Sequence, residues 1–205
     1  MYTSTQDVKG FTLVELSIVL VIIGLVTSGT LVGVHMIEQA RINTVISDFK
    51  HYNALFTQFR DKYQYLPGDL PNASSYWSGE DDGDGDNQVE RDGSLEERWW
   101  AWRHLYLADF VSVPYTGQVN HSGETPGVSG SIGGENVPMS EFSPSGNGGY
   151  ALQYDSSRGV NVLQLGTIGW SYTEGAILTP LQAYTVDNKM DDGVRDDGIV
   201  RAYNG

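Results

Sequence analysis

An uncharged apolar segment near the N-terminus constrains this chain more than any other feature. From Leu16 to Val34 the sequence runs for 19 residues without a charged side chain. As an α-helix this segment would be roughly 28 Å long, which is about the thickness of the hydrocarbon core of a bilayer. Helices of soluble proteins seldom hold so long an uncharged stretch, so we expect a helix that crosses a membrane.

A single carboxylate, Glu15, lies where the apolar run extends back towards Phe11. A charge in a membrane helix is costly and usually has a partner or a function. A plain single-span anchor explains the length of the segment but gives no reason for this charge. A secretory signal is disfavoured, because Asp7 offsets Lys9 and no small-residue cleavage site follows the apolar run.

The octapeptide at residues 9–16 (KGFTLVEL) resembles the prepilin signal of type IV pilins and type II secretion pseudopilins. The resemblance implies that prepilin peptidase cuts after Gly10 and that Phe11, N-methylated, begins the mature chain. It also implies that Glu15 is needed for assembly and meets the Phe11 amine of a neighbouring subunit. Residues 11 and 15 of one helix are also close enough to pair with each other. Either pairing avoids burying an unpaired ion.

The same resemblance implies a location and a set of partners. The partners would be identical or related pilin subunits, the prepilin peptidase and the inner-membrane assembly platform. The protein would be anchored in the bacterial inner membrane with its head outside the cytoplasm, and after assembly it would form a cell-surface or periplasmic filament. Nucleic acid is disfavoured as a main partner, because 26 acidic and 12 basic residues give a net charge of -14.

Beyond residue 35 the chain turns polar but keeps the spacing of a helix with one apolar face. We expect one helix from about residue 11 to residue 63, ended by Leu-Pro-Gly at 66–68. The stretch at 62–69 (KYQYLPGD) also resembles a junction found in many proteins with a prepilin leader. The apolar face predicts packing on a head, with a coiled-coil seam as the alternative. It comprises Ile42, Val45, Phe49, Tyr52, Phe56, Phe59 and Tyr63.

The predicted organisation is a leader at 1–10, a transmembrane and assembly half of the helix at 11–34, an amphipathic half at 35–66 and a globular head at 67–205. The predicted fold class is α+β, with the long N-terminal helix packed on a small antiparallel sheet that carries loop-rich insertions. Residues 111–149 are rich in Gly, Ser, Pro and Asn and are expected to be loops.

Further elements are expected within the head. A helix is predicted from Ser94 to Phe110, with Ser94 and Glu97 as a capping box. Two paired strands are predicted at 150–154 and 160–165 around a turn, and a last strand at 199–203. A short helix is predicted from Thr179 to about Lys189, because a cap residue is followed there by proline.

Two acidic stretches are candidate calcium sites. The first, at residues 80–92, alternates carboxylates like the first half of an EF-hand loop, but Asn87 takes the glycine position and Gly93 the place of the final glutamate. We therefore expect a looser calcium loop, with a merely solvated acidic loop as an equal alternative. The candidate ligands are Asp82, Asp84 and Asp86, together with Glu90 or Asp92.

The second acidic stretch repeats Asp-Asp-Gly near the C-terminus. Major pseudopilins bind calcium in a C-terminal loop, whereas many type IV pilins close theirs with a disulfide, which a chain without cysteine cannot form. The resemblance therefore favours calcium slightly over a solvated loop. The candidate ligands are Asp187, Asp191, Asp192, Asp196 and Asp197.

No catalytic motif points to an enzyme. The histidines lack metal-ligand spacing, and the sequence holds no H-E-x-x-H, G-x-S-x-G or P-loop motif. Acidic pairs leave a glycosidase open by composition, but the acids cluster with glycines, which suits ion binding or solvation better. We expect a structural filament subunit. The alternative is a single-span envelope binding protein or enzyme with a calcium-binding head.

Overall fold

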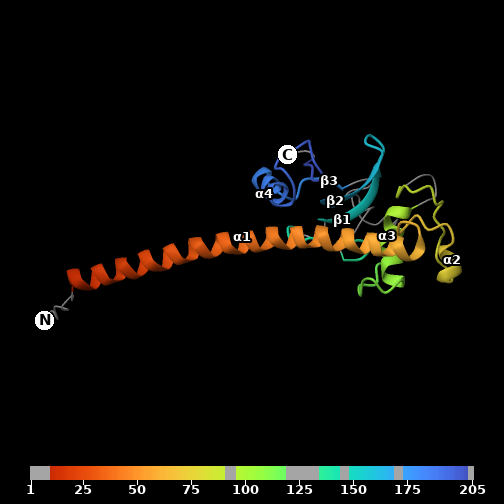
Figure 1. The fold of residues 1–205 in the computed structure, drawn as a ribbon. Helices are drawn as coiled ribbons and strands as arrows, with labels where there is room; N and C mark the ends of the chain where they lie inside the picture. The colour runs from red at the N-terminus through yellow and green to blue at the C-terminus, as the bar shows by residue number, and fades with distance from the viewer. Residues whose placement is uncertain (1–9, 91–95, 119–133, 144–147, 169–172, 203–205) are drawn as a thin grey trace, which may run out of the picture. The chain divides into compact units, whose positions relative to one another are not determined.

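The computed structural model describes residues 10–90, 96–118, 134–143, 148–168 and 173–202. The contacts between residues divide the chain into two units, residues 1–40 and 41–205. Within the described residues the fold is α+β, as predicted, with one long helix, three shorter helices and a small antiparallel sheet (Figure 1).

Helix α1 spans Leu13–Tyr63, which confirms the predicted long helix. Within the first unit its large apolar side chains are exposed, with Leu13 at 87% and Leu25 at 76%. Hydroxyl groups in this part of α1 donate hydrogen bonds to the helix backbone. Ser17 donates to the carbonyl of Val14 and Thr27 to that of Ile23, both at 2.8 Å. This arrangement satisfies polar groups without water, as an apolar environment requires.

The apolar face predicted for residues 42–63 packs into the core of the second unit. Ile42, Val45, Phe56 and Phe59 are buried, and the other predicted residues are partly buried against them. The face therefore serves core packing, and the coiled-coil alternative is wrong for these residues.

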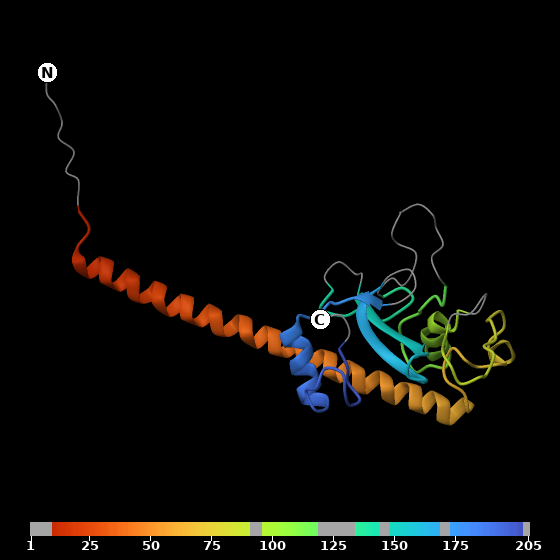
Figure 2. The same cartoon turned by 90° about the horizontal axis from the view of Figure 1, so that it is seen from above.

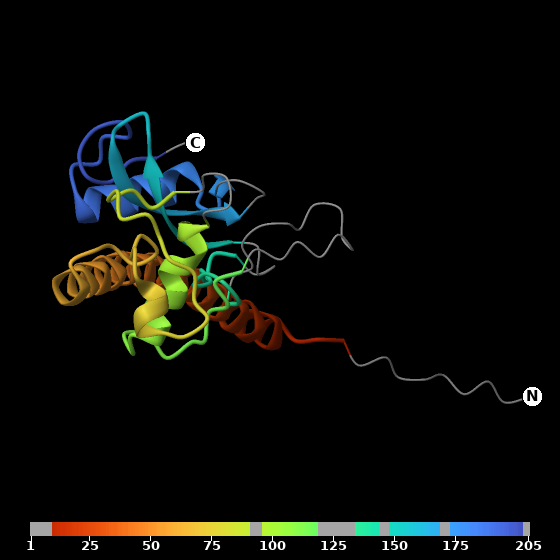
Figure 3. The same ribbon diagram turned by 90° about the vertical axis from the view of Figure 1, so that its right-hand side faces the viewer.

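Helix α3 (Glu97–Leu107) lies beside the C-terminal end of α1, and α2 (Ala73–Tyr76) is a single turn between them in sequence (Figure 3). Trp102 is fully buried, with the ring of Tyr52 edge-on at 5.0 Å between centroids. The predicted helix to Phe110 is too long, because Asp109 adopts a left-handed conformation with φ of 64°.

The predicted Ser94–Glu97 capping box is wrong. The N-cap of α3 is Glu96, which makes no side-chain cap hydrogen bond, and Ser94 lies outside the described residues. The carboxylate of Glu97 binds backbone amides of the acidic loop instead, as described below.

Strands β1 (Gly148–Asp155) and β2 (Val160–Ile168) form the predicted antiparallel hairpin, with Asp155 opposite Val160. A short strand β3 (Thr173–Gly175), which the sequence did not suggest, extends the sheet in the order β1-β2-β3. The predicted last strand is wrong for residues 199–202, because the amides of residues 199 and 200 donate to the carboxylate of Asp191 rather than to the sheet.

Helix α4 (Pro180–Met190) confirms the predicted C-terminal helix. Thr179 is its N-cap and forms a capping box with Gln182, and Pro180 is at the first helical position. Val186 of α4 is buried against Ile42 and Val45 of α1, where α4 crosses α1 (Figure 2). The predicted loop region is confirmed for residues 111–118 and 134–143, which hold neither a helix nor an extended strand, but it is wrong for Gly148 and Gly149, which belong to β1.

Candidate functional site

Glu15 caps the first turn of α1. Its Oε2 accepts hydrogen bonds from the backbone N–H and the hydroxyl of Thr12, both at 2.8 Å. The Thr12 hydroxyl oxygen in turn accepts a bond from the N–H of Glu15 at 3.2 Å. This reciprocal capping box satisfies amides that a helix start would otherwise leave free. Sequence reasoning assigned Glu15 to a pairing with the Phe11 amine, between or within subunits, and missed this local function.

Gly10 and Phe11 precede the helix and are exposed, Phe11 at 90%. Among the described residues, α1 is the one helix that is long and apolar enough to cross a membrane. The predicted cleavage point therefore lies immediately before a long apolar helix, and the acidic residue lies in the first turn of that helix.

The acidic loop brings two of its predicted ligands together and leaves out two others. Asp84 and Asp86 each place a carboxylate oxygen within 4.8 Å of the other and of Asp69. Asp82 is engaged elsewhere, since its two oxygens accept bonds from the N–H and hydroxyl of Ser74 at 2.8 and 3.0 Å. The group does not include Glu90, and Asp92 lies outside the described residues.

Asp69 is the ligand candidate that sequence reasoning missed. It is fully buried, and its Oδ2 accepts a hydrogen bond from the N–H of Asn87 at 2.8 Å. Its Oδ1 is buried without a hydrogen-bond partner. Burial raises the pKa of Asp69 to about 6, the amides of Gly85 and Asn87 oppose the rise, and the carboxylates of Asp86 and Asp84 add to it. The Leu-Pro-Gly-Asp junction was the only sequence signal for this residue.

Glu97 supports the loop from the first turn of α3. Its side chain is fully buried, with Oε1 accepting from the N–H of Asp84 at 3.1 Å and Oε2 from that of Glu90 at 3.2 Å. Burial raises the pKa of Glu97 to about 7. One carboxylate thus holds two points of the acidic loop onto α3.

The turn that carries Asp69 is itself fixed to α3. Gly68 has a φ of 94°, and a Cβ there would lie 2.3 Å from the carbonyl oxygen of Glu97, so only glycine fits. The N–H of Gly68 donates to Nδ1 of His104 at 3.0 Å. Burial lowers the pKa of His104 to about 4, which keeps the ring neutral and able to accept this bond.

Asn87 stands where an EF-hand loop has glycine, and it adopts the left-handed backbone conformation that glycine would allow there. Its φ is 69°, in the left-handed region that asparagine tolerates better than most residues. Asp84 Oδ1 accepts from the N–H of Asp86 at 3.0 Å, and Asp86 Oδ1 accepts from that of Gln88 at 2.7 Å. The first half of the loop therefore turns tightly around its carboxylates.

The C-terminal stretch forms a second group from three of its five predicted ligands. Asp187, Asp191 and Asp192 each offer an oxygen within 4.8 Å of the others. Asp187 is buried, which raises its pKa, and its Oδ1 has no hydrogen-bond partner. The group does not include Asp196 or Asp197. Asp196 contacts a neighbouring arginine at 3.3 Å, and Asp197 accepts the N–H of residue 198 at 2.8 Å.

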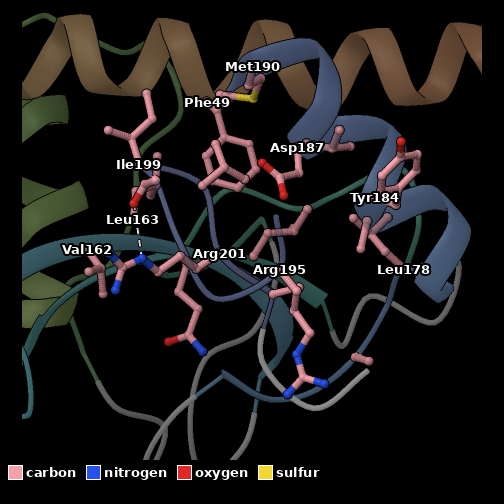
Figure 4. Close-up of a pocket in the computed structure, with 18 of the residues that line it drawn as sticks. Phe49, Val162, Leu163, Leu178, Tyr184, Asp187, Met190, Arg195, Ile199 and Arg201 are labelled. Carbon is pink, nitrogen blue, oxygen red and sulfur yellow. Dashed lines mark hydrogen bonds between the residues drawn. The ribbon is translucent and has the colours of Figure 1, made fainter. Parts of the chain in front are cut away.

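A groove of about 1220 Å³ lies between β2, α4 and the C-terminal segment (Figure 4). Val162, Leu163, Leu178 and Met190 contribute to a mainly apolar lining, which also includes Asp187. Among the described residues that line the groove, Asp187 is the one carboxylate.

The comparison with known families identifies the N-terminal region. Residues 6–31 match the family model described as the prokaryotic N-terminal methylation motif. No curated protein and no solved structure matches the chain. The matched segment includes Gly10, Phe11 and Glu15, and such a motif is typical of a structural subunit rather than an enzyme. With an exposed apolar helix beginning at Leu13, the chain carries a type IV pilin-like prepilin signal.

Proposed function

We propose that this protein is a structural subunit of a type IV pilus-like or pseudopilus filament. Prepilin peptidase cuts the precursor after Gly10, and the new N-terminal residue Phe11 is N-methylated. The subunit waits in the bacterial inner membrane with its head outside the cytoplasm. The assembly platform then adds it to a filament of identical or related subunits, at the cell surface or in the periplasm.

The observation that carries this proposal is the methylation motif at residues 6–31, placed directly at the start of an exposed apolar helix. Apolar side chains exposed all along residues 13–26 need a lipid or protein environment. A membrane provides that environment to the monomer, and neighbouring helices provide it in a filament. Both environments are required of a pilin.

The charge at Glu15 gives the assembly step a physical basis. Cleavage creates an amine at Phe11 with an unperturbed pKa near 8, so it carries a positive charge at neutral pH. Inside an apolar filament this cation needs a carboxylate, because an unpaired buried ion costs several kcal/mol. We propose that Glu15 of one subunit meets the Phe11 amine of its neighbour.

Mass spectrometry of the mature N-terminus tests the processing step. A chain that begins with methylated Phe11 supports the proposal. A mature chain that retains Met1 to Gly10 would instead indicate an anchored envelope protein. In cells that contain the prepilin peptidase, Glu15→Ala should leave leader cleavage intact and abolish the filaments recovered by shearing. A normal filament yield in this variant would refute the pairing step.

A further inference from the structure

We propose that Asp69, Asp84 and Asp86 together bind one calcium ion, which fastens the turn after α1 to the acidic loop. This ligand set differs from the one that the sequence suggests, because Asp69 enters it while Asp82 and Glu90 do not. The site lies within the head and does not depend on leader cleavage or filament assembly.

The spacing of the three carboxylates fits a single large cation. One oxygen of each carboxylate lies no more than 4.8 Å from one oxygen of each of the other two. Calcium binds oxygens at about 2.3–2.6 Å, so two ligands on opposite sides of one ion are roughly 4.8 Å apart. Magnesium requires a near-ideal octahedron and gives up its waters reluctantly, so a set of three protein carboxylates suits calcium better. Three carboxylates offer six oxygens, and because Asp84 and Asp86 are exposed, water can complete the coordination.

The buried oxygen of Asp69 is an independent indication of a ligand. Asp69 is 0% exposed, and its Oδ1 has no hydrogen-bond partner. A buried carboxylate oxygen without a partner is costly, and such groups are usually paired or coordinate a metal. The carboxylates of Asp84 and Asp86 repel that of Asp69, and Asp69 and the buried Glu97 also repel each other. A divalent cation would turn this repulsion into attraction.

The surrounding structure shows what the ion would hold in place. The backbone of Gly83 packs so closely on Asp69 that a Cβ at Gly83 would lie 2.7 Å from the Asp69 Cα. The side chain of Asn161 in β2 accepts from the N–H of Val89 and donates to the carbonyl of Asn87, both at 2.8 Å. The acidic loop thus already bridges the end of α1 and the sheet, and calcium would fix the face of the loop where the charges gather.

Thermal unfolding of the full-length chain in detergent tests the proposal. Calcium modules outside cells bind with dissociation constants of about 0.1–1 mM. After treatment with EDTA, 10 mM CaCl₂ should therefore raise the Tm by about 3–10 °C, and 10 mM MgCl₂ by much less. Sensitised terbium luminescence on the same sample reports ion binding directly.

Conservative variants locate the ion. Asp69→Asn should lose the calcium-dependent Tm rise while keeping or raising the Tm in EDTA, because the amide removes a buried charge. Asp86→Asn, at an exposed ligand position, should also lose the rise, and it decides the matter if Asp69→Asn fails to fold. Asp82→Asn is the matched control and should keep the rise, since Asp82 caps the α2 turn through Ser74.

Three outcomes would overturn the proposal. One is an unchanged melting curve together with no terbium signal in the wild type. Another is a calcium response that survives Asp69→Asn and Asp86→Asn but disappears in Asp187→Asn, which would place the ion in the C-terminal group. The third is loss of the response in Asp82→Asn alone, which would restore the ligand set suggested by the sequence.

Discussion

Two substitutions in the first turn of α1 can separate the capping function of Glu15 from its proposed function in assembly. Glu15→Gln removes the charge but keeps a side-chain acceptor for the Thr12 N–H, because glutamine also serves at this position of a capping box. Thr12→Ala keeps the charge but removes the hydroxyl that accepts the N–H of Glu15 at 3.2 Å. Glu15→Gln therefore lacks the charge but keeps the cap, whereas Thr12→Ala keeps the charge but lacks part of the cap.

The expected magnitudes differ by far more than the error of an assembly assay. Removing one partner of a buried ion pair costs about 3–5 kcal/mol. Each 1.4 kcal/mol is a factor of ten in an equilibrium constant, so Glu15→Gln should raise the subunit concentration needed for assembly by roughly a hundredfold to several thousandfold. Losing an N-cap costs about 1 kcal/mol, or roughly fivefold, and only at one end of a helix of 51 residues.

The assay is the ratio of sheared filaments to membrane-bound subunit, with the mature N-terminus checked by mass spectrometry in each strain. Correct cleavage in both variants shows that each subunit reached the membrane and was processed. We expect filaments in Thr12→Ala and none in Glu15→Gln. Abundant filaments in Glu15→Gln, or their absence in Thr12→Ala alone, would show that the carboxylate acts only as a helix cap.

Three further predictions concern the head, each measured by unfolding the full-length chain in detergent. Gly68→Ala should lower the free energy of unfolding by more than about 2 kcal/mol, because it adds a backbone clash to the cost of a left-handed φ. Gly79→Ala is the control, since Gly79 has a φ of 89° but nothing within 4 Å of an added Cβ, and equal losses in the two variants would refute the clash. His104 has a folded pKa of about 4 against 6.5 unfolded, so wild type should lose about 3 kcal/mol relative to His104→Gln as pH falls from 6.5 to 4; parallel pH profiles would contradict this. Tyr150→Phe should cost about 1–3 kcal/mol, because it removes the 2.9 Å hydrogen bond to Asp48, and an unchanged midpoint would show that the bond contributes nothing.

Local patterns predicted the regular elements well. The apolar face of residues 42–63, the hairpin around residues 155–160 and the Thr179-Pro180 helix start each depend on neighbours in sequence, and the structure confirms all three. The last strand failed because the carboxylate of Asp191 competes for the amides that a strand would give to a sheet. Side-chain competition of this kind leaves no trace in a hydrophobic pattern.

The cluster of Asp69, Asp84 and Asp86 could be predicted only in part, because its members come from segments that are distant in sequence. Asp84 and Asp86 follow from their alternation, but Asp69 enters the group through the fold of the turn after α1. That fold depends on the close approach of Gly68 to Glu97, a contact between residues far apart in sequence. Asp82 looked equivalent to Asp84 and Asp86 as a ligand in the sequence, but it does not join the cluster because it accepts a hydrogen bond from the N–H of Ser74.

The capping box at the start of α1 also bears on how reversible a filament would be. In the single chain Glu15 already has donors, so the carboxylate does not enter assembly as an unsatisfied charge. Pairing with a neighbour would exchange the Thr12 donors for an amine, and the net gain would be the difference between two satisfied states. A subunit leaving the filament could re-form its own cap at once. A filament built on such an exchange could be dismantled and its subunits used again.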